Sequence, residues 1–252
     1  MAMRSSNRLP ILAVITASLL TTMVGLHDAQ ADAQLGAQAS ARAPAAASAS
    51  ASAARPDPGS AEAIAARVQA FYDTTRTYQA RFEQVYHIEA YNRKKRSEGK
   101  VAFQRPGRMS WQYDEPNGNV VVSDGETLKV YEKDKSQVLE QPLAASQYPA
   151  VLSFLVGKGN LADMFTLRKL DEKRMNFEGG YVLEGTPKKP TTAYTKVLMY
   201  IDAETAQVRR MLVIDAQRNR NLFTFSNPTV NTPLPPNTFA FTPPPGTRVV
   251  RP

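Results

Sequence analysis

The chain has 252 residues, and its 31 Lys and Arg exceed its 23 Asp and Glu, which gives a formal net charge of +8 at pH 7. It contains no Cys and two His, so disulfide frameworks, thiolate metal sites and cysteine nucleophiles are excluded. The positive charge favours anionic partners, such as membrane surfaces, acidic proteins or nucleic acid.

The N-terminus has the pattern of a secretory signal peptide. A short basic opening precedes an uncharged apolar run at residues 9–26, and Ala29-Gln30-Ala31 supplies the small residues of a cleavage site. A permanent membrane anchor is the alternative, but Pro10 interrupts the run, which is only marginally long enough to span a bilayer. We therefore predict a cleaved signal peptide at residues 1–31, and export makes nucleic acid the least favoured partner.

The segment after the signal peptide is almost wholly Ala, Ser and Pro. Such a composition cannot bury enough apolar surface to offset the entropy cost of ordering, so residues 32–59 are predicted to be a disordered linker. Residues 60–252 then form one domain, which is long enough for a single sizeable core.

An amphipathic helix is expected to open this domain. Ser60 is a suitable N-cap, Glu62 lies in the first turn where the helix dipole favours a negative charge, and the apolar positions that follow have helical spacing. These positions are Ile64, Val68, Phe71 and Tyr72. The helix is predicted to end within residues 73–77, where Thr accumulates.

From Tyr78 onward the apolar period falls to two, which indicates a strand with one apolar and one polar face. The apolar face holds Ala80, Phe82, Gln84, Tyr86 and Ile88, and the polar face holds Arg81, Glu83 and His87. Similar alternation recurs near Val101, Met109, Leu128 and Val182, and within residues 194–201, 208–214 and 222–225. Many strands in series predict an antiparallel meander.

Turn sequences separate these strands, at 105–107, 115–118, 124–125, 179–180 and 202–204. An antiparallel sheet of this size with few helices must curl or close. The predicted fold is therefore mainly β (α+β), a strongly curved antiparallel sheet or open, unclosed β-barrel. The amphipathic helix and a short apolar segment at residues 150–156 are expected to form its helical lid.

The sequence offers little for catalysis. His87 is the single imidazole that remains after signal cleavage, and no nucleophile-elbow, calcium-loop or phosphate-loop sequence is present. A glycosidase or esterase is the rival class, but Asp114 and Glu115 are adjacent on a strand end and would point to opposite faces. We therefore expect no enzymatic activity, no catalytic residues, no metal and no cofactor.

A basic run, Arg93, Lys94, Lys95 and Arg96, falls between two predicted strands. The run is expected to be a solvated hairpin tip, and the alternative is electrostatic docking to an acidic partner or an anionic headgroup.

Several segments, in this order, resemble the periplasmic outer-membrane lipoprotein carrier family, LolA. They are Ala80-Arg-Phe-Glu-Gln84, Gly99-Lys-Val-Ala-Phe103, Gln104-Arg-Pro-Gly-Arg-Met-Ser-Trp-Gln-Tyr113, Pro116, Val122-Ser-Asp-Gly125 and the tail from Phe239 to Val249. The resemblance extends over nearly all of residues 60–250, although the middle of the chain matches by pattern more than by identity.

The resemblance implies an open antiparallel barrel whose apolar cavity, under a helical lid, takes the acyl chains of lipoproteins. An inner-membrane ATP-driven complex releases the lipoprotein, and the carrier delivers it through the periplasm to an outer-membrane receptor, working as a monomer. A periplasmic carrier or sensor of another lipid, such as a phospholipid or glycolipid, is the alternative on the same fold.

In this family an Arg just before the Pro of the central motif holds the lid closed through hydrogen bonds to lid backbone, and that position is Arg105 here. A guanidinium has five donors, which suits the carbonyl end of a short helix. The residues expected to line the lipid cavity, because alternation places them on apolar faces, are Phe82, Phe103, Met109, Trp111, Tyr113, Leu128 and Val130.

Overall fold

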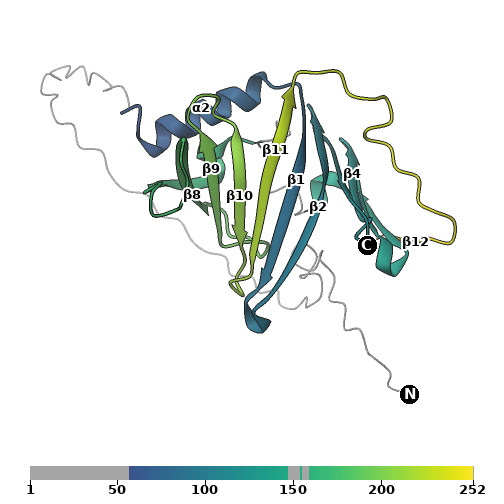
Figure 1. Ribbon diagram of the computed structural model, residues 1–252. Coiled ribbons are helices and arrows are strands. Elements are labelled where there is room, and N and C mark those ends of the chain that lie inside the picture. Colours follow the sequence, from purple (N-terminus) through teal and green to yellow (C-terminus); the bar gives the residue numbers. More distant parts are fainter. Residues whose placement is uncertain (1–56, 147–153, 155–158, 252) are drawn as a thin grey trace, which may run out of the picture.

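A computed structural model describes residues 57–146, 154 and 159–251 (Figure 1). The predicted signal peptide and all but the last three residues of the predicted linker lie outside the described residues, so these two predictions stay untested. The predicted lid segment at 150–156 also lies outside them, except for Phe154. None of the helices in the described part of the chain is long and apolar enough to cross a membrane.

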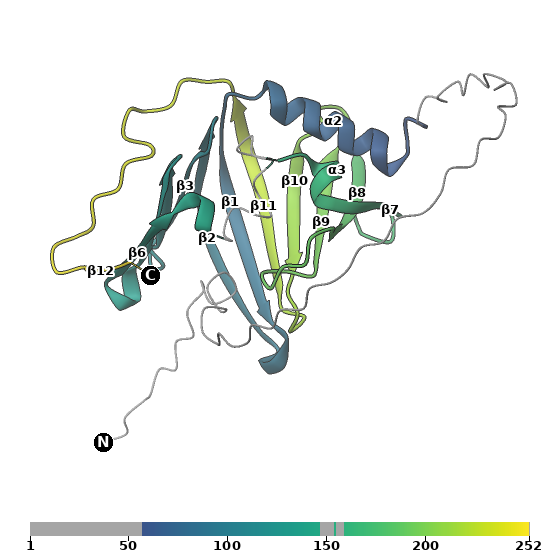
Figure 2. The same ribbon diagram turned by 180° about the vertical axis from the view of Figure 1, so that it is seen from behind.

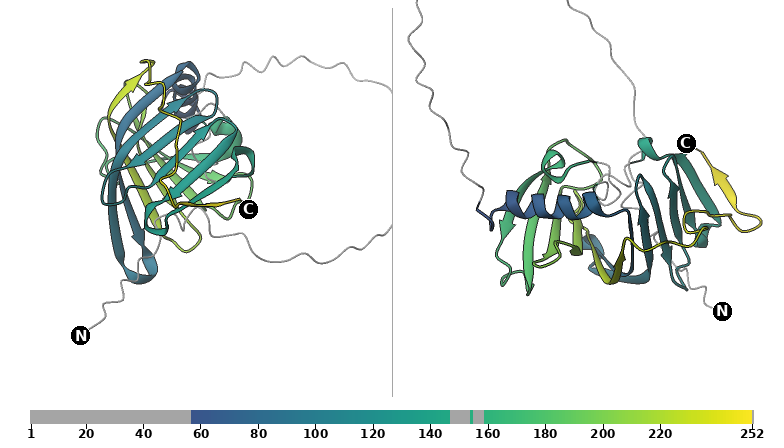
Figure 3. Two further views of the ribbon diagram at one scale, coloured as in Figure 1. Left: turned by 90° about the vertical axis from the view of Figure 1, so that its right-hand side faces the viewer. Right: turned by 90° about the horizontal axis from the view of Figure 1, so that it is seen from above.

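The described chain forms one 12-stranded sheet in the order β12-β6-β5-β4-β3-β2-β1-β11-β10-β9-β8-β7. The strands are β1 (Thr77–Ile88), β2 (Arg93–Gln104), β3 (Arg108–Tyr113), β4 (Val120–Asp124), β5 (Thr127–Glu132), β6 (Gln137–Pro142), β7 (Phe165–Leu170), β8 (Gly180–Pro187), β9 (Lys196–Asp202), β10 (Val208–Ile214), β11 (Arg220–Val230) and β12 (Arg248–Val250). All neighbours are antiparallel except β12 and β6, which are parallel. The order ends at β12 and β7, so the sheet is open and strongly curved, as predicted (Figure 3).

Within the described residues two helices accompany the sheet, α2 (Ala61–Thr74) and α3 (Leu161–Met164). The 3-10 turns are η1 (Glu89–Tyr91), η2 (Lys133–Lys135) and η3 (Leu143–Ala145). In α2 the Ser60 side chain accepts a hydrogen bond from the backbone N–H of Ala63 at 3.1 Å, which confirms the predicted N-cap. At the other end the Thr74 and Thr75 hydroxyls donate to carbonyls of the last turn, so the helix ends where the Thr residues accumulate.

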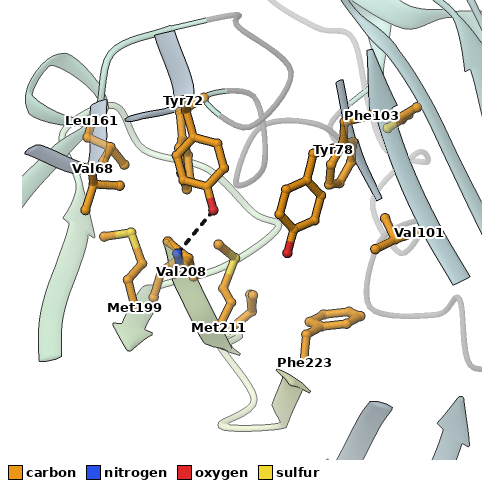
Figure 4. Packing of buried hydrophobic residues seen from close by; sticks show 14 of the residues in the cluster. Val68, Tyr72, Tyr78, Val101, Phe103, Leu161, Met199, Val208, Met211 and Phe223 are labelled. Atoms are coloured by element: carbon orange, nitrogen blue, oxygen red, sulfur yellow. Dashed lines mark hydrogen bonds between the residues drawn. The ribbon is translucent and has the colours of Figure 1, made fainter. Parts of the chain in front are cut away.

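Helix α2 runs across one end of the curved sheet, over its concave face (Figures 1 and 3). Its buried side, which includes Ile64, Val68 and Tyr72, joins a hydrophobic cluster on that face to which β1–β5 and β7–β11 all contribute. Strand β1 supplies Tyr78, Ala80 and Phe82 at alternate positions, which confirms the predicted period of two. Figure 4 shows side chains from α2, α3 and the strands meeting in this cluster.

The outer, convex face is covered in two separate places. The connection between β7 and β8 folds back over it, and its Phe177 is buried with Val182, Leu198 and Tyr200 in a second, smaller cluster. The segment between β11 and β12 lies over the β1–β5 half, where the Phe241 ring is 5.2 Å from the ring of Tyr131 (Figure 2). These connections complete the fold without a second layer of helices.

Two features differ from the sequence prediction. Strands β4, β6 and β7 and the short helix α3 were missed, because each is short and none has clean alternation bounded by turn residues. The basic run is exposed near the tip of the β1–β2 hairpin, as predicted, but it does not form the turn, since Arg93–Arg96 are the first residues of β2 and pair with Val85–Ile88 of β1. The chain reverses through η1 and Asn92, which adopts left-handed backbone angles (φ 46°, ψ 39°) that Asn tolerates better than most residues.

Candidate functional site

Helix α2 is attached to the rest of the molecule by a few polar contacts at scattered points. The Arg67 guanidinium donates to the Ala203 carbonyl oxygen in the β9–β10 turn at 2.5 Å, and the backbone N–H of Val208 donates to the Tyr72 hydroxyl at 3.2 Å. The backbone N–H of Leu161 in α3 donates to Gln69 Oε1 at 3.0 Å. The helix is thus tied to β10, to the turn before it and to α3.

The last turn of α2 is contacted by Arg105, which follows β2. Arg105 Nη1 donates to the Tyr72 carbonyl oxygen at 2.6 Å and approaches the Asp73 carboxylate at 3.4 Å. The Tyr72 carbonyl oxygen also accepts the C-cap hydrogen bond from the backbone N–H of Thr75 at 3.2 Å, so the guanidinium is its second donor and lies at the negative end of the helix dipole. Because the backbone N–H of Arg105 also donates to the Arg76 carbonyl oxygen, at 2.9 Å, both its side chain and its backbone join the β2–β3 turn to the end of α2.

The seven residues predicted to line a lipid cavity all lie in the cluster on the concave face. The exposed fractions are 2% for Phe82, 2% for Phe103, 1% for Met109, 0% for Trp111, 9% for Tyr113, 0% for Leu128 and 3% for Val130. The structure thus brings the seven together, and it shows them packed against one another and against α2 and its neighbours. Their role in holding lipid stays a prediction.

Trp111 lies at the centre of an aromatic group. Its ring centroid is 4.9 Å from that of Phe82, 5.9 Å from Phe103, 5.4 Å from Phe223 and 6.1 Å from Phe225. Most of these pairs have edge-to-face geometry, which aromatic rings prefer in protein interiors. The group joins β1 and β11 to β3 across the concave face.

Sequence reasoning missed the contribution of strands β9, β10 and β11 to the concave face. Met199 of β9, Met211 of β10 and Phe223 of β11 are register partners in neighbouring strands and lie beside Tyr72 and Tyr78 (Figure 4). The alternation within residues 194–201 and 208–214 was visible, but it could not indicate which half of each strand would meet the β3 aromatics. Methionine suits an adaptable apolar surface because its side chain is unbranched and polarizable.

The phenols on the concave face are held neutral. Burial raises the pKa of Tyr72, Tyr78 and Tyr113 well above the ordinary value for a tyrosine. The face therefore presents aromatic carbon and uncharged polar groups at physiological pH.

Two polar atoms on this face have no hydrogen-bond partner among the described residues, Gln84 Oε1 and Trp111 Nε1. The Gln84 amide nitrogen is paired, since it donates to Asn221 Oδ1 at 2.8 Å. Buried polar groups without a partner are uncommon in folded proteins, so both atoms need an explanation.

The basic run lies apart from the concave cluster, at the far end of the β1–β2 hairpin. Arg93, Lys94, Lys95 and Arg96 are exposed, and Arg96 forms an ion pair with Glu83 of β1. His87 lies near this end, where Nε2 is 3.1 Å from Asn92 Oδ1 and Nδ1 is 3.8 Å from Glu89. Within the described ranges no three His, Asp or Glu side chains are grouped so as to hold a metal ion.

The fold and this site define a class of protein, an open antiparallel sheet whose apolar concave face is covered by a helix held in place by few polar bonds. Residues 73–242 match the family model described as "Outer membrane lipoprotein carrier protein LolA". Since this match extends over most of the chain, the protein belongs to the LolA family.

Individual relatives agree with this assignment. An outer-membrane lipoprotein carrier protein of Ralstonia nicotianae is 36% identical over 155 residues, which cover 62% of this chain and 69% of the relative. That of Chromobacterium violaceum is 29% identical over 193 residues, 77% of this chain and 89% of the relative.

Among solved structures, an uncharacterized conserved protein from Thermus thermophilus aligns with a TM-score of 0.47 and 15% identity, over 76% of this chain and 98% of that one. A LolA superfamily protein from Nitrosomonas europaea aligns with a TM-score of 0.42 and 15% identity, over 72% and 98%.

Proposed function

We propose that the protein is a periplasmic carrier that binds the acyl chains of lipoproteins released from the inner membrane and delivers them to the outer membrane. Membership of the lipoprotein carrier family supports this function. The observation that best supports it in the structure is the position of α2, which covers an aromatic and aliphatic concave face and is contacted at its end by Arg105. Such an arrangement can take up an apolar ligand when the cover moves.

The physical need for a carrier follows from the cost of exposing acyl chains to water. At about 0.8 kcal/mol per CH₂, one chain of roughly fifteen carbons costs on the order of 12 kcal/mol to expose. A lipidated protein therefore does not cross an aqueous compartment unaided. The carrier must replace the membrane as the apolar environment and must still release its cargo.

In the state described here the concave face contacts its own cover. Its side chains, including Phe82, Trp111 and Met211, are buried in one cluster with residues of α2 and α3. Protein interiors are close-packed, so an acyl chain can enter only if α2 and the residues beside it move outward. Cargo and cover then compete for the same apolar surface, which keeps binding reversible.

The contact between Arg105 and the Tyr72 carbonyl affects the equilibrium between the covered state and the open, loaded state. The hydrogen bond forms in the covered state, so it stabilises that state relative to the open, loaded one. In this proposal Arg105 promotes release, because each departure of cargo restores the bond. The seven predicted cavity residues would contact the acyl chains once α2 has moved.

Loading and unloading need two docking partners. An inner-membrane ATP-driven complex would load the carrier and an outer-membrane receptor would unload it. The exposed basic residues at the start of β2, such as Arg93 and Lys94, would add long-range attraction to an acidic partner or an anionic surface. The protein would act without catalysing a reaction.

The test is native mass spectrometry of the protein purified from periplasm under mild conditions, followed by solvent extraction and lipid analysis. The proposal expects a bound acylated lipoprotein in stoichiometric amount. Recovery of phospholipid or glycolipid alone would replace it with the other-lipid carrier. An empty protein that hydrolyses acyl or glycosyl substrates would overturn it.

A further inference from the structure

The indole N–H of Trp111 is a hydrogen-bond donor buried on an otherwise apolar surface. The residue is 0% exposed, and Nε1 has no acceptor among the described residues. Leaving a buried donor unpaired costs about 1–3 kcal/mol, a large penalty for a marginally stable fold. At a position that only packs in the core, Phe would avoid this cost, because it has an aromatic ring without a hydrogen-bond donor.

The surroundings of Trp111 explain why the covered state does not satisfy this donor. The rings of Phe82, Phe103, Phe223 and Phe225 lie around the indole, and none of them has an acceptor oxygen. Trp111 pairs across the sheet with Val101 and Val121, which are also apolar. In the covered state the donor therefore has no acceptor among the described residues.

We infer that Trp111 Nε1–H is a recognition point for the ester carbonyl that joins an acyl chain to its head group. This inference rests on the proposed function and deepens it, because it states what the apolar face selects for besides hydrocarbon. An acyl chain inserted along the aromatic group places methylenes against Phe82 and Phe223 and its carbonyl oxygen within reach of the indole. The bond is made only in the loaded state.

An ester fits this point better than other linkages. Trp has a donor and no acceptor, and an ester carbonyl is an acceptor without a donor, so the pairing leaves no new polar hydrogen buried. An ether-linked chain lacks the carbonyl oxygen, and a bare alkyl chain has no acceptor. Gln84 Oε1, the other unpartnered atom on this face, is an acceptor and plays no part in binding an ester.

The chain has a single Trp, which makes the test specific. The delipidated full-length carrier, labelled with ¹⁵N at the indole, gives one indole resonance, and that resonance belongs to Trp111. It is titrated with a synthetic lipopeptide that has two ester-linked palmitoyl chains, and separately with the same lipopeptide bearing ether-linked hexadecyl chains. The expected result is a downfield shift of the indole proton with the ester probe alone and about tenfold tighter binding of that probe, the effect of one hydrogen bond.

A second measurement removes the donor and keeps the shape. Growth on a benzothienylalanine, in which sulfur replaces the indole N–H, changes only position 111. The preference for ester over ether probe should then fall to about onefold. A matched control, Phe177→Leu, removes a buried aromatic ring from the outer-face cluster, keeps the N–H and should keep the preference.

The outcomes separate this inference from the proposed function. Equal affinity for both probes without a downfield shift would refute the role of Trp111 and leave the carrier function standing. Failure of both probes to bind would refute the carrier function and this inference with it. If the analogue-containing protein does not fold, the indole resonance of the unmodified protein still tests the role of Trp111.

Discussion

The two faces of the sheet are covered in different ways. The concave face forms one continuous cluster that reaches from β5 to β7 and lies under α2, α3 and Phe154. The outer face is buried in patches, under the β7–β8 connection around Phe177 and under the segment before β12 around Phe241. The continuous apolar surface of the concave face, covered by α2 through few polar bonds among the described residues, suits a ligand site. The separate apolar patches of the outer face, buried under loop segments, suit a role in stabilising the fold.

The first prediction tests the concave face at its centre. Trp111→Ala removes a fully buried ring and should lower the free energy of unfolding by about 3–5 kcal/mol, because the aromatic group cannot collapse to fill the space. Urea unfolding followed by circular dichroism measures the change. A cost below about 1 kcal/mol would mean that the cluster is loosely packed and already has room for a ligand.

The second prediction applies a similar truncation to the outer face. Phe177→Ala should cost about 3 kcal/mol of stability, at the low end of the range for an aromatic side chain, because the residue packs in the smaller cluster. It should leave lipopeptide affinity unchanged when measured well below the unfolding midpoint. Lost affinity in the folded variant would contradict the division of roles between the two faces.

The third prediction concerns the link between cover and sheet. Arg105→Leu removes the bond to the Tyr72 carbonyl, and because a hydrogen bond from a charged group contributes about 1.5 kcal/mol, the variant should retain bound lipopeptide about tenfold longer. Dissociation into acceptor vesicles, followed by fluorescence of a labelled lipopeptide, measures the retention.

Arg108→Leu is the matched control for that variant, since Arg108 is exposed and lies three residues away at the start of β3. It should release its cargo at the rate of the unmodified protein. Equal retention by both variants would show that local charge, and not the contact with α2, sets the release rate.

The smallest expected effect is an acid sensitivity at the other attachment of α2. The pKa of Asp202 is lowered, chiefly by the hydrogen bond that its carboxylate accepts from the Thr205 backbone N–H. Asp202 thereby orders the β9–β10 turn, in which the Ala203 carbonyl oxygen accepts the hydrogen bond from Arg67 of α2. A depressed pKa in the folded state stabilises the fold above the unfolded value of about 3.9, and this stabilisation is lost as pH falls through the folded pKa. Urea midpoints of the unmodified protein and Asp202→Asn should differ from pH 6 down to about pH 4 and converge only at lower pH, as the pH falls through the depressed folded pKa. A constant difference over this range would exclude Asp202 as the source.

Local signals were sufficient for a good part of the fold. Ser60 as N-cap, the period of two in β1 and the turns at 105–107 and 202–204 each depend on neighbouring residues, and each lies where it was predicted. The basic run shows the limit of such signals. Its turn contains neither Gly nor Pro, and Asn92 alone adopts the left-handed conformation that reverses the chain.

The sequence by itself determined the open antiparallel sheet, the apolar character of one face of each strand and the helix that begins the domain, because periodicity and capping act over a few residues. Only the tertiary structure decided which apolar faces meet, so that Phe223 of β11 packs on Trp111 of β3. The same is true of the acceptor of Arg105, a carbonyl 33 positions earlier in the chain, and of the indole N–H, which has no acceptor among the described residues. A hydrogen bond, or its absence, depends on positions within a fraction of an ångström, and those positions are set by the packing of the whole sheet.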